Sequence, residues 1–115
     1  MDTDRVLAYD LAFIGSLICF SSEERDQMIN IMLVDDEVLA LDYLKNMVEW
    51  EKYGYHIVGC ANSGKKALEL YDKTTPEIVI SDIRMPAMDG LEMTKRLKKK
   101  NKDVVVILLS AYKDF

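Results

Sequence analysis

Short apolar runs alternate with amphipathic stretches from residue 28 onward, and this alternation constrains the fold more than any other feature of the sequence. Three stretches place apolar side chains at helical spacing: residues 37–49, the segment from Ala67 to Tyr71 that stops at Thr74-Thr75-Pro76, and residues 90–100. Four apolar runs lie between and around these stretches and predict strands at 29–34, 55–61, 77–81 and 104–109. Strands that are apolar throughout and joined by helices are typical of parallel sheets. We therefore expect an α/β open sheet with helices on both faces.

Composition limits the function classes. The chain has 115 residues, which suits one domain, and its 50% hydrophobic and 30% charged residues exclude a disordered chain. The net charge of -5 argues against direct binding of nucleic acid, because phosphate contacts need a basic surface. Two cysteines without a CxxC spacing and one histidine exclude a Cys/His zinc site. This cysteine usage fits a reducing cytoplasm, where we expect the protein to be located.

The first 27 residues differ from the rest. Their apolar run, residues 11–20, is shorter than the ~20 residues that a membrane-spanning helix needs. The residues before this run are acidic, whereas a signal peptide begins with positive charge. We interpret residues 1–27 as an N-terminal extension, helical or disordered, and residues 28–115 as the domain, with no membrane association.

Acidic side chains follow two of the predicted strands. Asp35 and Asp36 come directly after the first strand and Asp82 after the third, while Ser110 follows the fourth. In a sheet of order 2-1-3-4-5 the first and third strands are neighbours, and ligands bind beyond their carboxyl ends. Clustered carboxylates repel one another unless a cation neutralises them, and carboxylates with a carbonyl and waters suit Mg²⁺. The alternative is that these are solvated loop residues.

Such a site fits phosphate chemistry, since a metal ion can bridge a carboxylate and a phosphoryl oxygen. In this interpretation Asp82 is the nucleophile and Asp36 a direct Mg²⁺ ligand. Asp35 binds the metal directly or through water, and the Ser110 hydroxyl donates to a phosphoryl oxygen.

Three segments carry a resemblance to a known family: LVDDE at 33–37, VISDIRMPAMDG at 79–90 and VILLSAYKDF at 106–115. In this combination the chain resembles the receiver domain of two-component response regulators. The resemblance implies a flavodoxin-like fold in which Asp82 accepts a phosphoryl group from a sensor histidine kinase. It also implies that the backbone carbonyl of Arg84 completes the Mg²⁺ shell, and that the side chains of Arg84 and Tyr112 influence how fast the phosphate is lost. A receiver is a phosphoacceptor that catalyses only its own phosphorylation and dephosphorylation, so we expect no enzyme in the usual sense.

A finer resemblance, at residues 48–68 and 110–115, is to receivers attached to AraC-type helix-turn-helix output domains. It implies a downstream transcriptional output. The output domain itself is not in this chain, so DNA binding is not assigned to it.

The sequence departs from the family pattern at its end. Residues 28–115 contain four of the family's five strands and three of its five helices, and the phosphoryl-contacting lysine and usual dimerisation face are among the parts not found. The strand at 104–109 would then have a bare apolar edge. We therefore expect a fragment of a longer product, or an oligomer that forms as a homodimer or by edge-strand pairing. A sharper hypothesis is that residues 7–20 form a helix in the vacant fifth-helix position.

Two other functions remain as alternatives. The first is a Mg²⁺-dependent phosphohydrolase with an aspartate nucleophile, although haloacid-dehalogenase-like enzymes carry that aspartate in a DxD motif after the first strand. Here the two aspartates after the first strand, Asp35 and Asp36, are adjacent. The second is an inactive receiver fragment that keeps the site residues without a stable fold.

Overall fold

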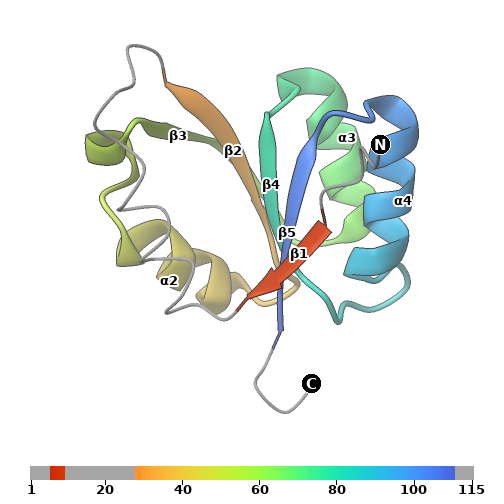
Figure 1. Ribbon diagram of the computed structural model, residues 1–115. Helices are drawn as coiled ribbons and strands as arrows, with labels where there is room; N and C mark the ends of the chain where they lie inside the picture. Colours follow the sequence, from red (N-terminus) through yellow and green to blue (C-terminus); the bar gives the residue numbers. More distant parts are fainter. Residues whose placement is uncertain (1–5, 10–27, 111–115) are drawn as a thin grey trace.

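The computed structural model describes residues 6–9 and 28–110, and this part of the chain forms one parallel sheet (Figure 1). The sheet has five strands in the order β1-β5-β4-β2-β3. Their bounds are β1 Val6–Tyr9, β2 Ile29–Val34, β3 Tyr55–Ala61, β4 Ile78–Asp82 and β5 Val105–Leu109. All four predicted strands are confirmed within one residue at each end. β2 and β4 are neighbours, as the expected strand order requires.

Helices cover both faces of the sheet, as predicted. One face carries α2 (Val38–Met47) followed by a short 3₁₀ helix, η1 (Trp50–Tyr53), and the other carries α3 (Gly64–Thr74) and α4 (Gly90–Lys100) (Figure 1). Within the described residues, no helix has the length and apolar character needed to cross a membrane.

Local hydrogen bonds fix where these helices begin and end. The Asp89 side chain accepts a bond of 2.8 Å from the backbone N–H of Glu92 and so caps the start of α4. Ser63 caps α3 in the same way. At the end of α2 the indole N–H of Trp50 donates to the carbonyls of Leu44 and Lys45, both at 3.1 Å, which satisfies groups that a helix end leaves unpaired.

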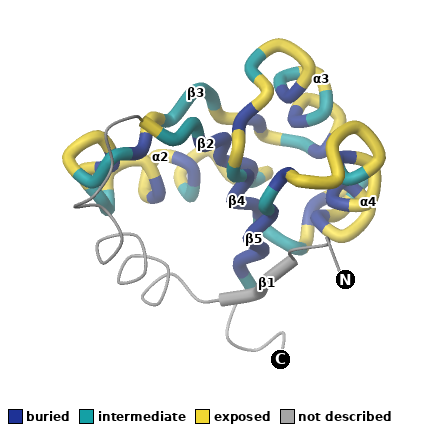
Figure 2. The backbone as a smooth tube through the Cα atoms, turned by 45° about the horizontal axis from the view of Figure 1, so that its top comes forward, coloured by how far each residue is buried: buried dark blue, intermediate teal, exposed yellow. Residues whose placement is uncertain are grey.

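Two apolar layers enclose the sheet because successive side chains of a strand point to opposite faces. In β2, Met32 and Val34 belong to the layer under α3 and α4, while Ile31 and Leu33 belong to the layer under α2. All four side chains are at most 1% exposed. Figure 2 shows the result: the central strands are buried, and exposed residues lie on the outer sides of the helices.

The edge of the sheet is different from our expectation. β1 pairs in parallel with β5, from Val6 opposite Val106 to Tyr9 opposite Leu109 (Figure 1). It therefore lies beside the predicted fourth strand, at the place that the order 2-1-3-4-5 gives to a fifth. The prediction that β5 has a bare outer edge is wrong, because the same chain supplies a partner for its unpaired N–H and C=O groups.

The same strand corrects two expectations for the extension. Residues 7–9 lie in β1, so the hypothesis of a helix over 7–20 is wrong there, and residues 10–20 lie outside the described part. Likewise residues 6–9 are neither helical nor disordered. The sequence of β1, VLAY, is short and apolar, and a strand of four residues has no periodicity that separates it from the start of an apolar helix.

Candidate functional site

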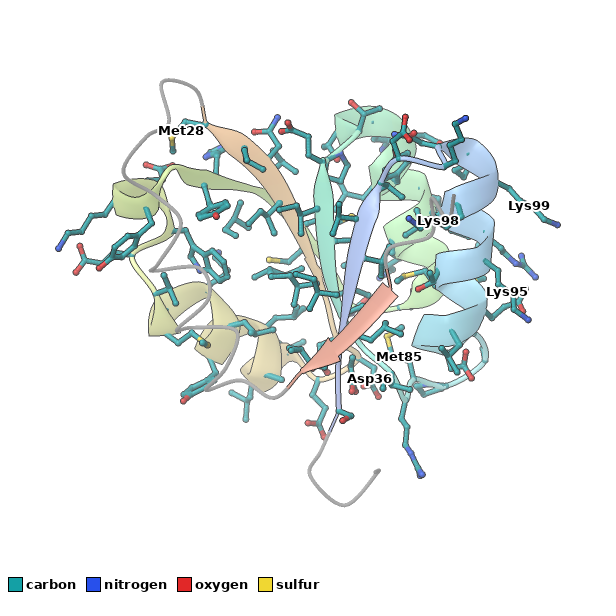
Figure 3. All side chains as sticks on the ribbon, viewed as in Figure 1. Met28, Asp36, Met85, Lys95, Lys98 and Lys99 are labelled. Carbon is teal, nitrogen blue, oxygen red and sulfur yellow. The ribbon has the colours of Figure 1, made fainter. Side chains whose placement is uncertain are left out.

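Three carboxylates meet at the carboxyl end of the sheet. Asp82 is the last residue of β4, and Asp35 directly follows β2. The two strands pair up to Val34 opposite Ser81, so the next residue on each chain is Asp35 and Asp82. One carboxylate oxygen each from Asp35, Asp36 and Asp82 lies within 4.8 Å of the others. The predicted meeting of these side chains is therefore found in the structure, and Figure 3 marks its position by the label of Asp36.

The electrostatics of the cluster are most marked at Asp35. Burial raises the pKa of this carboxyl to about 6, and the negative charges of Asp82, Asp36 and Glu37 raise it as well. A backbone hydrogen bond from the N–H of Glu37, at 3.0 Å, acts in the opposite direction. A bound cation would stabilise the ionised form of Asp35 and offset the repulsion among the three carboxylates.

The donor set fits a hard divalent cation. The described residues bring together carboxylate oxygens only, with no thiol or imidazole among them, and oxygen ligands are what Mg²⁺ takes in proteins. Asp36 is exposed and Asp35 and Asp82 are half-buried, so the cluster is open to solvent on one side. Arg84 lies two residues beyond Asp82 and is exposed, and its carbonyl as a further ligand stays a prediction.

Ser110 belongs to the same place. It directly follows β5, whose Leu109 is opposite Asp82. A cavity of about 180 Å³ lies between α2 and the end of β5, and Asp35, Asp82 and Ser110 all line it. The predicted hydroxyl is thus beside the carboxylates, whereas Tyr112 lies outside the described residues.

The walls of this cavity include residues that the sequence analysis missed. Ala40, Tyr43 and Leu44 of α2 face the acidic end, and Tyr43 is 60% exposed. Their spacing of three and four residues on one helix is the signal that could have found them. A larger cavity, of about 400 Å³, lies between α2, β3 and α3 and has none of the three aspartates in its lining. We assign the site to the smaller cavity, because two of the clustered carboxylates, Asp35 and Asp82, line that one.

The loop from Ile83 to Asp89 follows Asp82 and leads to α4. Met85 is 8% exposed and packs in the layer under α3 and α4. The N–H of Gly90 donates to the carbonyl of Ile83 at 2.7 Å and closes the loop. Helix α4 can approach this closely because Gly90 has no Cβ: an added one would lie 2.4 Å from the backbone oxygen of Asp82.

Basic side chains gather at the far end of α4, away from the carboxylates (Figure 3). Several already have partners in the fold. The ammonium of Lys98 donates to the carbonyl of Val104, and Lys100 pairs with Asp72 at 3.0 Å. Arg96 pairs with Glu92 one turn earlier, also at 3.0 Å. These contacts, and the favourable position of cations at a helix C-terminus, account for the run of basic residues in α4, so no binding of nucleic acid is needed to explain it.

A parallel sheet with an acidic cluster at the carboxyl ends of adjacent strands defines an α/β domain whose site lies where open sheets of this kind bind their ligands. The model of the response regulator receiver domain matches residues 31–115, and the chain belongs to this family. The resemblance noted in the sequence is thereby confirmed, as is the flavodoxin-like fold.

Relatives and solved structures agree with this assignment. The transcriptional regulatory protein YesN of Bacillus subtilis is 40% identical over 88 residues, which are 76% of this chain and 24% of YesN. The positive alginate biosynthesis regulatory protein of Pseudomonas aeruginosa is 39% identical over the same share of this chain and 35% of its own length. Among solved structures, a two-component transcriptional regulator AraC from Clostridium phytofermentans has a TM-score of 0.70 at 34% identity. That match covers 75% of this chain and 69% of the regulator.

The receiver domain of AraT from Geobacillus stearothermophilus has a TM-score of 0.72 at 26% identity, over 77% of this chain and 69% of that domain. The curated relatives are considerably longer than the matched part. This chain spans between about a quarter and two fifths of their length.

Proposed function

We propose that the chain is the phosphoacceptor part of a response regulator and that Asp82 takes the phosphoryl group from a sensor histidine kinase. The observation that carries this proposal is the meeting of Asp35, Asp36 and Asp82 within 4.8 Å at the carboxyl ends of β2 and β4. Membership of the receiver family supports it. Residues 28–115 would be the receiver part, and the extension 1–27 would contribute the edge strand β1.

In this proposal Asp82 is the nucleophile, because it ends β4 at the position of the phosphoacceptor in the receiver family. It lines one cavity together with Asp35 and Ser110. One of its oxygens attacks the phosphorus atom of the phosphohistidine. The new O–P bond forms as the P–N bond breaks, and the imidazole leaves with the electron pair of that bond. The product is an acyl phosphate on Asp82.

The other residues prepare this step. Asp35, Asp36 and Asp82, with the carbonyl of Arg84, would hold Mg²⁺. The chemistry that Mg²⁺ would supply there is neutralisation of the clustered negative charge and of the charge on the incoming phosphoryl group. The hydroxyl of Ser110 donates a hydrogen bond to a phosphoryl oxygen, so it senses whether Asp82 is modified. The added charge would then change the surface that a transcriptional output reads.

A direct test uses acetyl phosphate as the phosphoryl donor and intact mass as the readout. With Mg²⁺ we expect the parent to gain one phosphoryl group, and without Mg²⁺ to gain none. Asp82→Asn is the matched control, because it keeps the size of the side chain and removes the nucleophile. A parent that folds but stays unmodified would overturn the proposal in favour of an inactive fragment, and steady release of phosphate without a modified protein would favour a phosphohydrolase.

A further inference from the structure

The loop that follows the phosphoacceptor contains a strained residue. Ala87 has a φ of 68°, in the left-handed region that residues with a Cβ rarely adopt. The N–H of Met88 donates to the carbonyl of Pro86 at 2.7 Å, which closes a three-residue turn centred on Ala87. A turn of this kind with a positive φ is the rare, strained form. It persists only where the surroundings hold it.

Met88 is held against the first residue of α3. A Cβ built on Gly64 would lie 2.8 Å from the sulfur, 2.9 Å from the Cγ and 3.0 Å from the Cβ of Met88. The contact thus involves the whole Met88 side chain and not only its flexible end. Gly64 is buried, and Met88 packs against the same apolar layer as Met85. The absence of a side chain at position 64 makes the space in which Met88 lies.

Hydrogen bonds hold the start of α3 in place, so Gly64 is fixed on its side of the contact with Met88. The Ser63 side chain accepts from the N–H of Lys66 at 3.1 Å, and the Ser63 carbonyl accepts from the N–H of Ala67 at 2.9 Å. At its other end α3 is joined to α4 by the bond from Asn101 to the hydroxyl of Tyr71, at 3.1 Å. An added methyl group at Gly64 would therefore displace Met88 rather than the helix.

We propose that Gly64 is a positioning residue: through its contact with Met88 it holds the strained loop at Ala87, and with it the arrangement of Asp82 and the Arg84 carbonyl. Gly64 touches neither phosphoryl group nor metal and acts only through Met88. The role in phosphorylation rests on the proposed function, whereas the hold on the loop does not.

The test is a double-mutant cycle of Gly64→Ala, Met88→Ala and both together. In the parent background we expect Gly64→Ala to slow modification by acetyl phosphate and Mg²⁺ by about tenfold or more, since a misplacement of ~1 Å costs on the order of 10²-fold in rate. In the Met88→Ala background the same change should alter the rate by less than about twofold, because the sulfur and Cγ atoms that the added methyl group would meet most closely are gone. Gly59→Ala is the matched control, since its Cβ would meet the Leu70 side chain of α3 and not the loop.

A second readout follows the loop without any reaction. The N–H groups of Met88 and Gly90 both donate within the loop, and we expect their hydrogen exchange to accelerate in Gly64→Ala but not in Gly59→Ala. Unchanged exchange would overturn the proposal, and so would a loss of rate on Gly64→Ala that is equal in the parent and in the Met88→Ala background. If the parent is never phosphorylated, the proposed function fails by itself, and the exchange of these two amides decides whether Gly64 holds the loop.

Discussion

Asp36 is the most exposed of the three clustered carboxylates, so its role in binding Mg²⁺ can be separated from a role in packing. We expect Asp36→Asn to weaken Mg²⁺ binding by at least about tenfold, because even ligand-supporting residues change metal affinity by ~10- to 100-fold. Isothermal titration with MgCl₂ measures the change. Asp103→Asn is the matched control, since Asp103 is also exposed but precedes β5, at the other end of the sheet. Equal affinities of the two variants would contradict the assignment of Asp36 as a ligand.

The pKa of Asp35 has a consequence for stability in the absence of metal. Burial raises the folded-state pKa to about 6 from an ordinary value of 3.8, so between these values the folded chain binds more protons than the unfolded chain. The contribution of Asp35 to the free energy of unfolding is therefore most favourable below its ordinary pKa. It falls as the pH rises through the folded value and is constant above it.

Urea denaturation in EDTA across this pH range measures that dependence. We expect the slope to be smaller in Asp35→Asn, which cannot ionise, and in the parent with saturating Mg²⁺. The same slope in the parent and in Asp35→Asn, both in EDTA, would show that Asp35 is not the group responsible.

Gly90 is the residue at which an added methyl group meets fixed backbone. A Cβ would lie 2.4 Å from the Asp82 oxygen, whereas a Cβ at Gly59 would lie 2.7 Å from the movable end of Leu70. We expect Gly90→Ala to lower the free energy of unfolding by about 1–3 kcal/mol, despite the better helix propensity of alanine. Gly59→Ala should cost less, because Leu70 can change its side-chain conformation. Chemical denaturation of both variants decides, and a larger loss for Gly59→Ala would contradict this account of the loop.

At the scale of elements, the least expected part is β1. Among the described strands it has one neighbour, β5, so alternate N–H groups point to that neighbour and away from it. Proline removes an N–H group and is tolerated in an edge strand only where that group faces solvent. Of the adjacent substitutions Leu7→Pro and Ala8→Pro, we therefore expect one to lower the free energy of unfolding by at least about 1 kcal/mol, the usual net value of a hydrogen bond, and the other to cost less.

The thermal unfolding midpoint and the soluble fraction of both variants test this pairing. The variant that loses the bond should also associate more, because the apolar edge of β5 becomes available to other chains. Two variants with the same midpoint as the parent would show that β1 does not contribute to the sheet.

The elements that the sequence predicted well are those with a strong pattern of their own. β2 and β3 are mostly apolar and are bounded by Asp35 and by Asn62-Ser63-Gly64, and α4 begins at the residue after the Asp89 cap. The acidic cluster was predictable because the strand order alone brings Asp35 and Asp82 to one edge. β1 was not, because each of its four apolar residues pairs with a residue 100 positions later, which leaves no local signal.

At the scale of the whole molecule, β1 extends the sheet beyond β5, and the carboxyl end of the sheet carries the acidic cluster with Ser110 beside it. Packing on both faces fixes the central strands, and the strained loop at Ala87 joins the site to the α3–α4 layer. A receiver built in this way should direct the phosphoryl group to one carboxylate, although three lie within 4.8 Å of one another.

The most direct test of the central claim is to locate that carboxylate. After reaction with acetyl phosphate and Mg²⁺, borohydride reduces an acyl phosphate on aspartate to the alcohol of homoserine, and peptide mapping finds the converted residue. We expect conversion at Asp82 alone, dependent on Mg²⁺ and absent in Asp82→Asn. Conversion at Asp35 or Asp36 in the parent, or no converted residue in a chain that has gained the mass of a phosphoryl group, would contradict the account.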